Sequence, residues 1–330
     1  MVNYTNDSSD TDVSNLALGI SYIAFGLFGI AINVLTGLMI ACDTEMRNPT
    51  YYYMTNLCFA DAVILIPVAI FCGLVLIHAQ IWNATFVKIG AYLVAVGWNP
   101  SCVFMVLMSY SRHVQLKSPN NLVIRGREMK KIWASILLPW ILPSCTYIWV
   151  LHYEPPPVIL VISQYCWTFD EETSLGQGFR LLTMVWTGGV VALVAYFNTK
   201  SLLAVRNMRK QILHAEMDRN LKREIKLFVQ CAATTTIFSA MAITYFAVNG
   251  IKSGIESSGF VIAHLLWLLN HTHSPIVYYT LNKRLRRRLL SLVGWRKRAI
   301  NNGSELKSET RTTKFELTSG TVPPARSNSA

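Results

Sequence analysis

The chain has 330 residues, of which 52% are hydrophobic and only 15% are charged, and its mean hydropathy is +0.34. Soluble domains carry about 25% charged residues, so this composition excludes an ordinary soluble domain and indicates a membrane protein. The formal net charge of +12 does not indicate nucleic-acid binding, because the basic residues gather in a few loops between apolar runs. The seven cysteines include no CxxC pair and no spacing typical of a metal site.

Seven apolar runs follow one another along the chain, each of about 20–26 residues, the length that a membrane-spanning helix needs. A segment in lipid must satisfy its own backbone hydrogen bonds, and a helix does so within one segment. We therefore predict an all-α membrane protein, a seven-transmembrane helix bundle over residues 16–282. The runs cover residues 16–41, 52–77, 89–111, 132–151, 179–199, 227–248 and 259–281.

The charge of the loops predicts the orientation of this bundle. Lys and Arg are concentrated in residues 112–131, in residues 200–226 and after residue 282, whereas residues 152–178 contain acids and no Lys or Arg. Because basic loops stay on the cytoplasmic side, we expect an extracellular N-terminal segment (residues 1–15), a cytoplasmic C-terminus and a multi-pass protein of the plasma membrane. Glycosylation sequons fall on the predicted outside at Asn3, Asn6 and Asn83.

Two segments follow the last apolar run. Residues 283–296 combine basic residues with leucines, which predicts a juxtamembrane amphipathic helix on anionic membrane lipid; a charge cluster that only stops translocation is the alternative. Residues 297–330 are rich in Ser, Thr, Asn and Pro, and we expect them to form a disordered cytoplasmic tail. Phosphorylation of its hydroxyl groups between Ser304 and Ser319 would add the charge that an arrestin-like protein binds.

One acidic residue, Asp61, lies inside the second apolar run, far along the chain from any Lys or Arg. A charged side chain at membrane depth costs about 2.5–3.5 kcal/mol, so it usually faces the interior of a helix bundle and has a partner there. We expect Asp61 to form an ion or switch site. An acid that only packs within the bundle is the alternative.

Each run carries a short motif, and the order of these motifs resembles that of the rhodopsin-like G-protein-coupled receptors. A single motif is a weak signal, but one set in every run over residues 16–290 is a specific pattern. The matching residues are Gly29 and Asn33 in the first run, Asn56, Leu57, Ala60 and Asp61 in the second, Arg112 and Pro119 after the third, Trp133 and Pro143 in the fourth, Tyr196 in the fifth, Phe238 in the sixth, and Ser274, Pro275, Tyr278 and Asn282 in the seventh.

The resemblance implies a function and a switch. Such a receptor transmits the binding of an extracellular ligand to a heterotrimeric G protein through outward movement of its sixth helix. Arg112 would pair with Glu224 in the resting state, and a surface ion pair of little energy is the alternative. In the active state Tyr196 and Tyr278 would meet the arginine. Pro275 would let the seventh helix bend, because proline removes a backbone hydrogen bond.

The resemblance also implies a sodium ion beside Asp61 that favours the inactive state, with Ser101, Asn270 and Ser274 around it. We expect no other cofactor. His271 stands where relatives carry a small polar residue, so it either fills this space or competes with the ion as a protonated cation.

Several positions depart from the family pattern. Ser111 replaces the acid before the arginine and His113 replaces the tyrosine after it, which removes one restraint on Arg112. The sixth run reads Met241-Ala-Ile-Thr where relatives have Cys-Trp-x-Pro, and Gly188 replaces the proline of the fifth run.

The disulfide of the family is also affected. Val87 takes the place of the cysteine that pairs, in the family, with the long extracellular loop, so Cys166 in that loop has no obvious partner. We assign no disulfide. Cys72 in the upper second run remains an alternative partner, because the sequence does not give the geometry that a disulfide needs.

The ligand is the least constrained part of the prediction. Val94 replaces the acid of amine receptors and Leu268 the lysine of visual pigments, so both ligand classes are disfavoured. Residues 158–169 are strand-like and three acids follow them, as in many peptide receptors of the family, which favours a peptide ligand and a basic one. The candidate pocket residues, for which packing or an interfacial aromatic belt is the alternative, are Tyr92, Trp98, Tyr245, Asn249, His264 and Trp267.

Three rival functions remain open. A transporter or channel would be indicated by inverted repeats or by several intramembrane charges. An intramembrane hydrolase would use His264, His271 and His273, but the last two are two residues apart and do not share a helix face, so we expect no enzymatic activity. A receptor-like protein that no longer couples to a G protein is compatible with Ser111 and with the changed sixth run.

The predicted orientation can be tested on intact cells. A protease added outside should leave a tag at the C-terminus intact, because the basic stretch after residue 282 holds that end in the cytoplasm. Immunoblotting of the tag after digestion measures this, with an N-terminal tag as the control that must be cleaved. Loss of the C-terminal tag without permeabilisation would contradict the topology.

Overall fold

A computed structural model gives the arrangement of the chain. The chain divides into two compact units, residues 1–282 and residues 283–330, and each is described by itself. The described part of the chain comprises residues 9–78, 83–117, 126–148, 152, 157–161, 166–211, 215–250 and 257–292.

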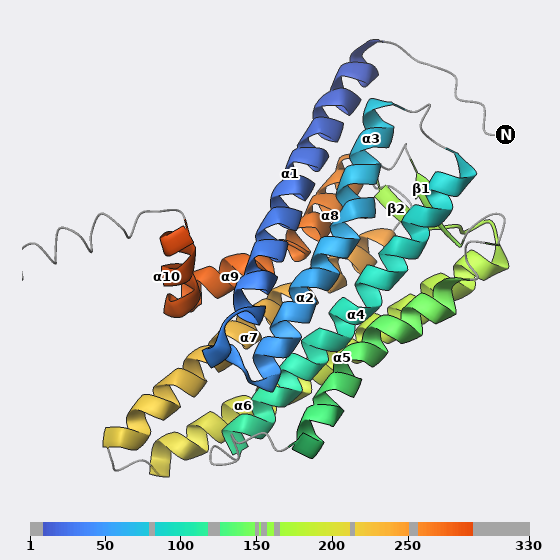
Figure 1. The fold of residues 1–330 in the computed structure, drawn as a ribbon. Helices are drawn as coiled ribbons and strands as arrows, with labels where there is room; N and C mark the ends of the chain where they lie inside the picture. The colour runs from blue at the N-terminus through green and yellow to red at the C-terminus, as the bar shows by residue number, and fades with distance from the viewer. Residues whose placement is uncertain are drawn as a thin grey trace, which may run out of the picture. The chain divides into compact units, whose positions relative to one another are not determined.

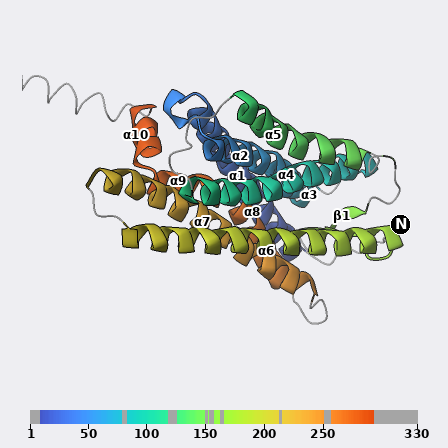
Figure 2. The same cartoon turned by 90° about the horizontal axis from the view of Figure 1, so that it is seen from below.

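The first unit is a bundle of seven spans, as predicted, and two of the spans are broken (Figure 1). The second span consists of α2, the π-helical turn η2 and α3, and the seventh consists of α8 and α9. The first span is α1, and the third to sixth spans are α4, α5, α6 and α7, so that α7 is the sixth span. The helices are α1 (Ser9–Ala41), α2 (Pro49–Leu65), η2 (Ile66–Phe71), α3 (Cys72–Ile77), α4 (Ala84–Lys117), α5 (Gly126–Tyr147), α6 (Ser174–Gln211), α7 (Ala215–Gly250), α8 (Ser257–Asn270) and α9 (His273–Leu281), with a 3-10 turn η1 (Thr44–Met46) and the strands β1 (Val158–Val161) and β2 (Cys166–Phe169) between them. Figure 2 shows the same helices from below, with α6 and α7 on the side away from α5.

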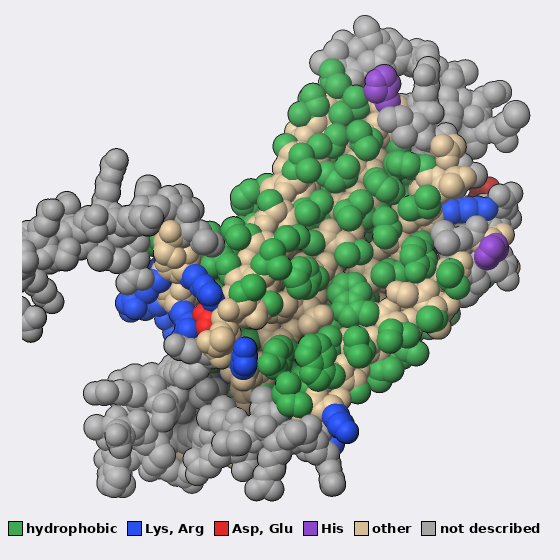
Figure 3. Space-filling model, in the orientation of Figure 1, with side chains coloured by type: hydrophobic (Ala, Val, Ile, Leu, Met, Phe, Trp, Pro, Cys, Tyr) green, Lys and Arg blue, Asp and Glu red, His purple; other side chains and the backbone are tan. Residues whose placement is uncertain are grey.

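The surface of this bundle suits lipid. Five of the described helical stretches are long and apolar enough to cross a membrane, judged by length and composition only. The other two spans are α5, which carries Lys130 and Lys131 near its start, and the interrupted α8–α9. Apolar side chains cover the face in Figure 3, and on α6 Leu181 and Val185 are 64% and 66% exposed. Such a surface is unfavourable in water and matches the hydrocarbon of a bilayer.

Proline explains the break in the second span. Pro67 has no N–H group and its ring clashes with the preceding turn, and the helix widens there into the π-helical turn η2. Two successive carbonyl oxygens of this turn accept hydrogen bonds from other elements. The Trp167 indole N–H of β2 donates to the oxygen of Pro67 at 2.9 Å, and Nε2 of His264 on α8 lies 2.9 Å from the oxygen of Val68.

Pro275 explains the break in the seventh span. Without an N–H group, Pro275 cannot donate to the carbonyl oxygen of His271 four residues earlier, and a turn at His271 and Thr272 separates α8 from α9. The Asn33 side chain of α1 donates to that oxygen instead, at 2.7 Å. The seventh span therefore has the bend that Pro275 predicted, and Asn33 stabilises it.

The spans α2 and α4 approach closely at Gly97. A Cβ atom at this position would lie 2.7 Å from Cβ of Ile64 and 2.8 Å from the Ile64 backbone nitrogen. Rotation of a side chain cannot relieve a contact with backbone, so this approach depends on glycine. Asp61 lies one turn before Ile64 on α2, and the same contact therefore sets how near Asp61 comes to α4.

The second unit contains the described helix α10 (Lys283–Leu292). This helix covers the first ten residues of the amphipathic segment predicted at 283–296. Residues 293–296, the predicted tail at 297–330 and the sequons at Asn3 and Asn6 lie outside the described residues. The binding of this helix to lipid stays a prediction.

The close approach at Gly97 generates a stability prediction. Gly97→Ala should lower the thermal unfolding midpoint of the detergent-solubilised protein, because overpacking of this kind costs about 1–3 kcal/mol. The matched control is Gly188→Ala on α6, where an added Cβ meets nothing within 4 Å. Equal midpoints for the two variants would show that α2 and α4 do not approach as described.

Candidate functional site

The Asp61 carboxylate lies within the bundle on α2 and is fully buried. Its Oδ1 atom accepts a hydrogen bond from the Ser101 hydroxyl of α4 at 2.9 Å. The same atom lies 2.7 Å from Nδ1 of His271, in the turn between α8 and α9. Asp61 therefore joins the second, third and seventh spans.

The neighbours of His271 indicate which of its nitrogens carries the proton. The indole N–H of Trp267, which can only donate, lies 3.1 Å from Nε2 of His271, so Nε2 accepts. The proton of the neutral ring is then on Nδ1, and Nδ1 donates to Asp61. Trp267, His271, Asp61 and Ser101 thus form one continuous hydrogen-bonded chain in which His271 needs no charge.

The residues predicted to surround a sodium ion also carry oxygen atoms that take no part in this series of hydrogen bonds. Oδ2 of Asp61, Oδ1 of Asn270 and Oγ of Ser274 are buried and have no hydrogen-bond partner in the described structure. Carboxylate, amide and hydroxyl oxygens are the ligand types that hard cations prefer, so the chemistry of these residues fits a sodium ion. His271 takes up space on the Oδ1 side, which is the first of the two roles predicted for it.

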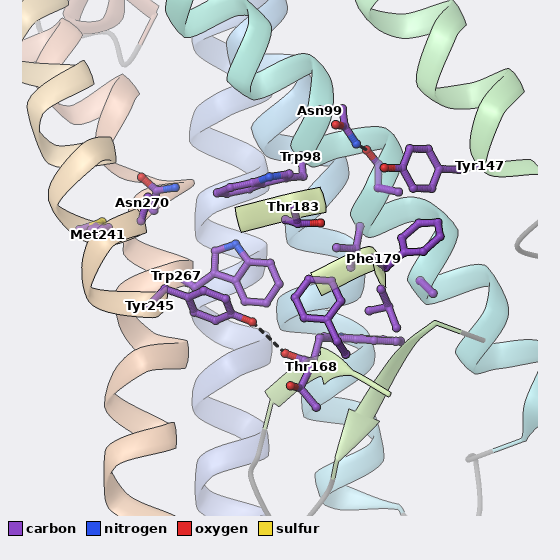
Figure 4. Close-up of a pocket in the computed structure, with 17 residues that line it drawn as sticks. Trp98, Asn99, Tyr147, Thr168, Phe179, Thr183, Met241, Tyr245, Trp267 and Asn270 are labelled. Atoms are coloured by element: carbon purple, nitrogen blue, oxygen red, sulfur yellow. Dashed lines mark hydrogen bonds between the residues drawn. The ribbon is translucent and has the colours of Figure 1, made fainter. Parts of the chain in front are cut away.

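A cavity of about 80 Å³ lies against the inner side of the hairpin, among α4, α6, α7 and α8; Figure 4 shows it with the hairpin at the bottom of the view. Its lining is mostly aromatic and aliphatic, and none of the described lining residues is charged. Three residues predicted for the ligand pocket, Trp98, Tyr245 and Trp267, line this cavity together with Asn270. Figure 4 shows Tyr245 and Trp267 side by side, and their ring centroids are 5.1 Å apart.

Two other predicted pocket residues do not line the cavity. The Tyr92 hydroxyl donates to the carbonyl oxygen of Ser144 on α5 at 3.3 Å, and His264 binds the backbone of η2. In this structure these two side chains contact the backbone of neighbouring helices, and their part in a ligand pocket stays a prediction. Asn249 lies at the end of α7, and its side chain is outside the described residues.

An aromatic cluster leads from the cavity to Asp61. The Trp98 ring centroid lies 6.4 Å from that of Trp267, 5.8 Å from that of Phe238 and 5.9 Å from that of His271. Phe238 is fully buried on α7. The sixth run, which forms α7, lacks the tryptophan of the family motif. Trp98 of α4 and Trp267 of α8 place large rings beside α7 instead.

Arg112, near the C-terminal end of α4, is buried and donates from Nε to the Thr50 hydroxyl of α2 at 2.7 Å. That hydroxyl lies 2.6 Å from Oγ of Ser111, so the serine that replaces the family acid belongs to the same network. The side chain of Glu224 on α7 is outside the described residues. The Arg112–Glu224 pair therefore stays a prediction, and the contact of Arg112 with Thr50 is one that the motifs did not indicate.

The two predicted switch tyrosines lie in different environments. Tyr278 is fully buried, and its hydroxyl donates to the sulfur of Met108 on α4 at 3.7 Å. Tyr196 is 55% exposed and lies edge-to-face with Phe197, with Nζ of Lys200 5.6 Å from its ring centroid. The predicted meeting of Tyr196 with Arg112 is therefore absent from this conformation, because the tyrosine lies on the outer surface of α6.

Two polar contacts of α7 were missed by motif comparison. Nδ2 of Asn198 on α6 donates to the Thr235 hydroxyl at 2.8 Å. Nε2 of His273 lies 3.0 Å from the carbonyl oxygen of Thr234 on α7, and its Nδ1 lies 2.7 Å from that of Asn270. Carbonyl oxygens only accept, so a neutral His273 satisfies one of them and a protonated His273 satisfies both. The available signal was the presence of polar residues in otherwise apolar runs: Asn198 in the fifth, Thr234 and Thr235 in the sixth, and His273 in the seventh.

The strand-like residues 158–169 contain two strands that form a hairpin. Strands β1 and β2 pair antiparallel, with Val158 opposite Phe169 and Val161 opposite Cys166. Three residues of β2, Trp167 to Phe169, line the cavity. The Cys166 side chain is outside the described residues, so its pairing with Cys72 stays an alternative.

Known proteins agree with the motifs and the fold. The family model of the serpentine type seven-transmembrane G-protein-coupled chemoreceptor Srt matches residues 3–302. Mouse Opsin-3 is 22% identical over 307 residues, which cover 87% of this chain and 73% of that protein. A probable G-protein coupled receptor of Caenorhabditis elegans is 20% identical over 325 residues, which cover 82% of this chain and 65% of that protein. Squid rhodopsin matches in structure with a TM-score of 0.76 at 13% identity, over 89% of this chain and 85% of the squid chain.

The family match extends over most of the chain, and the seven-span fold is that of rhodopsin. The chain therefore belongs to the Srt family of serpentine chemoreceptors, which are G-protein-coupled receptors of the rhodopsin-like type that its motifs resemble.

Proposed function

We propose that this G-protein-coupled receptor responds to a small, neutral, largely apolar molecule that binds in the cavity beside the hairpin. The observation that carries the proposal is the lining, which is aromatic and aliphatic without a charged side chain among the described residues. A volume of about 80 Å³ holds a compact molecule, since one water molecule needs about 10–15 Å³ by a comparable measure. The few polar groups, such as Thr183, Asn270 and the Tyr245 hydroxyl, would orient one polar atom of the ligand.

A basic peptide, which the sequence favoured, finds less support in this geometry. The cavity offers no acid to a cationic side chain among the described residues. In the segment after β2, Glu171 is already paired with Arg180. The description of the matching family as chemoreceptors also favours a small chemical ligand.

Activation would consist of an outward movement of α7, the sixth span, away from the neighbouring spans. The ligand would press on Tyr245 of α7 and Trp267 of α8, which share the cavity wall and touch each other. Outward movement of α7 would break the contacts of Thr234 and Thr235 with the neighbouring spans. A G protein would then enter the cleft that opens beside Arg112.

We also propose that the resting receptor holds a sodium ion near Asp61. Oδ2 of Asp61, Asn270 and Ser274 would bind the ion, and the buried oxygens without partners support this set. The ion would supply a positive charge beside the carboxylate, while Ser101 and His271 hold its other oxygen.

The surroundings of the receptor complete the proposal. The basic loops support a plasma-membrane protein with its N-terminus outside, and the charge of α10 supports its binding to anionic lipid. Asn83 is exposed, and its Oδ1 accepts from the N–H of Phe86, which leaves the glycan-bearing nitrogen outside that bond. Asn3 and Asn6 remain proposed glycosylation sites, and the tail a proposed arrestin-binding segment.

The ligand class is tested by G-protein activation in cells with measured surface expression of the receptor. Neutral small molecules should activate it and basic peptides should not. Val94→Phe fills the cavity and should weaken an active compound about tenfold or more, a loss of about 1.4 kcal/mol. Val229→Phe is the control, because Val229 is 45% exposed on α7 and does not line the cavity.

Two outcomes would count against this ligand class: activation by peptides alone, or an unchanged response of the Val94 variant. Silence towards every compound, with basal signalling that Arg112→Ala does not alter, would instead favour the receptor-like protein that no longer couples.

The sodium proposal is tested by Asp61→Asn, which keeps the size of the side chain and deletes its charge. Sodium should weaken activator binding to the wild type, because a ligand of the resting state opposes a ligand of the active state. The effect should vanish in Asp61→Asn, and folding should survive because the polar neighbours can repack. Activator affinity is measured in sodium and in a large organic cation at equal ionic strength.

His271→Asn is the companion variant, because it removes the ring that lies against Oδ1 of Asp61. It should keep the sodium effect or increase it. Equal affinities in the two cations for the wild type would reduce Asp61 to a packing residue.

A further inference from the structure

The hairpin beside the cavity cannot form the disulfide that, in the family, links this loop to the third span. Val87 on α4, at the position where the family carries the cysteine, is 4% exposed and has no thiol. It belongs to a buried apolar cluster that also contains Cys72 of α3, Leu160 of β1 and Trp167 of β2. No disulfide can form at Val87, so non-covalent contacts must hold the hairpin to α4.

Trp167 is a hairpin residue whose side chain is fully buried against the bundle. It is the largest of the fully buried side chains. Its indole N–H donates to the carbonyl oxygen of Pro67 at 2.9 Å, inside the π-helical turn of the second span. A buried N–H group needs such a partner, and the interaction joins residues 100 positions apart.

Gly90 makes room for the other edge of the same ring. A Cβ atom on Gly90 would lie 2.3 Å from Cη2 and 2.6 Å from Cζ2 of Trp167. The indole therefore occupies a slot between η2 and α4 that any larger residue at position 90 would close. Proline at 67 and glycine at 90 each supply one wall of this slot.

The backbone of Trp167 is hydrogen-bonded to α7, the sixth span. The Tyr245 hydroxyl of α7 donates to the carbonyl oxygen of Trp167 at 3.2 Å, the bond drawn beside Tyr245 in Figure 4. Tyr245 also contacts the Trp267 ring, and all three residues line the cavity. Trp167, which fixes the hairpin, thus also contacts α7.

We propose that Trp167 is a positioning residue that anchors the hairpin between η2 and α4 and links the hairpin side of the cavity to α7 through Tyr245. The anchor replaces a covalent attachment of the hairpin to α4. Its signalling part rests on the proposed function, since a ligand against the hairpin would reach α7 by this contact.

The anchor itself is tested by a double-mutant cycle on the purified full-length receptor, which needs no ligand and no G protein. Trp167→Phe removes the indole N–H and the ring atoms that face Gly90, and Gly90→Ala closes the slot. Each single change should lower the thermal unfolding midpoint by a few degrees. In the Trp167→Phe background Gly90→Ala should cost much less, because the atoms it collides with are gone.

The cycle carries its own controls. Gly188→Ala on α6, with nothing within 4 Å of the added Cβ, should lower the midpoint in neither background, because alanine favours the helix and meets no clash. A reductant should shift the wild-type midpoint by less than Trp167→Phe does. Additive effects of the two changes, or a reductant effect as large as that of Trp167→Phe, would overturn the anchor.

The link to α7 is tested separately with Tyr245→Phe, which removes only the hydroxyl donor. Basal G-protein activation per receptor at the cell surface should change by at least about twofold in Tyr245→Phe. In the Trp167→Phe background the same substitution should change it less. An unchanged basal activity, with the stability cycle as predicted, would overturn the link to α7 and leave both the anchor and the ligand proposal in place.

Discussion

The ionised form of a fully buried acid such as Asp61 is costly among apolar helices unless neighbouring groups donate hydrogen bonds to it. Ser101 and His271 are placed to do so from the third and seventh spans. These contacts require α2 to lie close to α4, which Gly97 permits, and they require the seventh span to present His271. The break imposed by Pro275 puts His271 in a turn, where its carbonyl oxygen bonds to α1 and its ring to Asp61. The break in the helix and the buried charge therefore support each other.

The same network connects the cavity to α7, the sixth span, by a route that differs from the family motif. The tryptophan and proline of the usual sixth-run motif are absent, and Trp98 of α4 and Trp267 of α8 pack beside Phe238 and Tyr245 instead. Trp267 also orients the ring that donates to Asp61. A molecule in the cavity thus touches residues whose neighbours include both the buried charge and α7.

The seven spans and the bend at Pro275 could be predicted, because apolar run length and proline chemistry leave few arrangements. The place of Ser101 beside Asp61 was implied by the family resemblance, and its direct hydrogen bond to the carboxylate came from the structure. The direction in which each predicted side chain points depends on the rotation of its helix, which the motifs do not give. The fifth run is apolar nearly all round, so its composition did not show that Tyr196 faces outward. A π-helical turn shifts the facing of the residues beyond it, since each residue accounts for about 100° of a helical turn. No pattern in the sequence indicated that this turn would accept hydrogen bonds from His264 and Trp167, which come from distant segments.

The central claim is that polar contacts from the seventh span restrain α7 in the resting receptor. The most direct test is the distance between spin labels on Lys117→Cys of α4 and Lys226→Cys of α7, two exposed positions, after the exposed cysteines Cys42 and Cys145 are replaced by serine. His273→Phe removes the contact with the Thr234 carbonyl oxygen while keeping an aromatic ring. The account predicts a longer or broader distance distribution in His273→Phe than in the matched parent without any ligand. Identical distributions would contradict it.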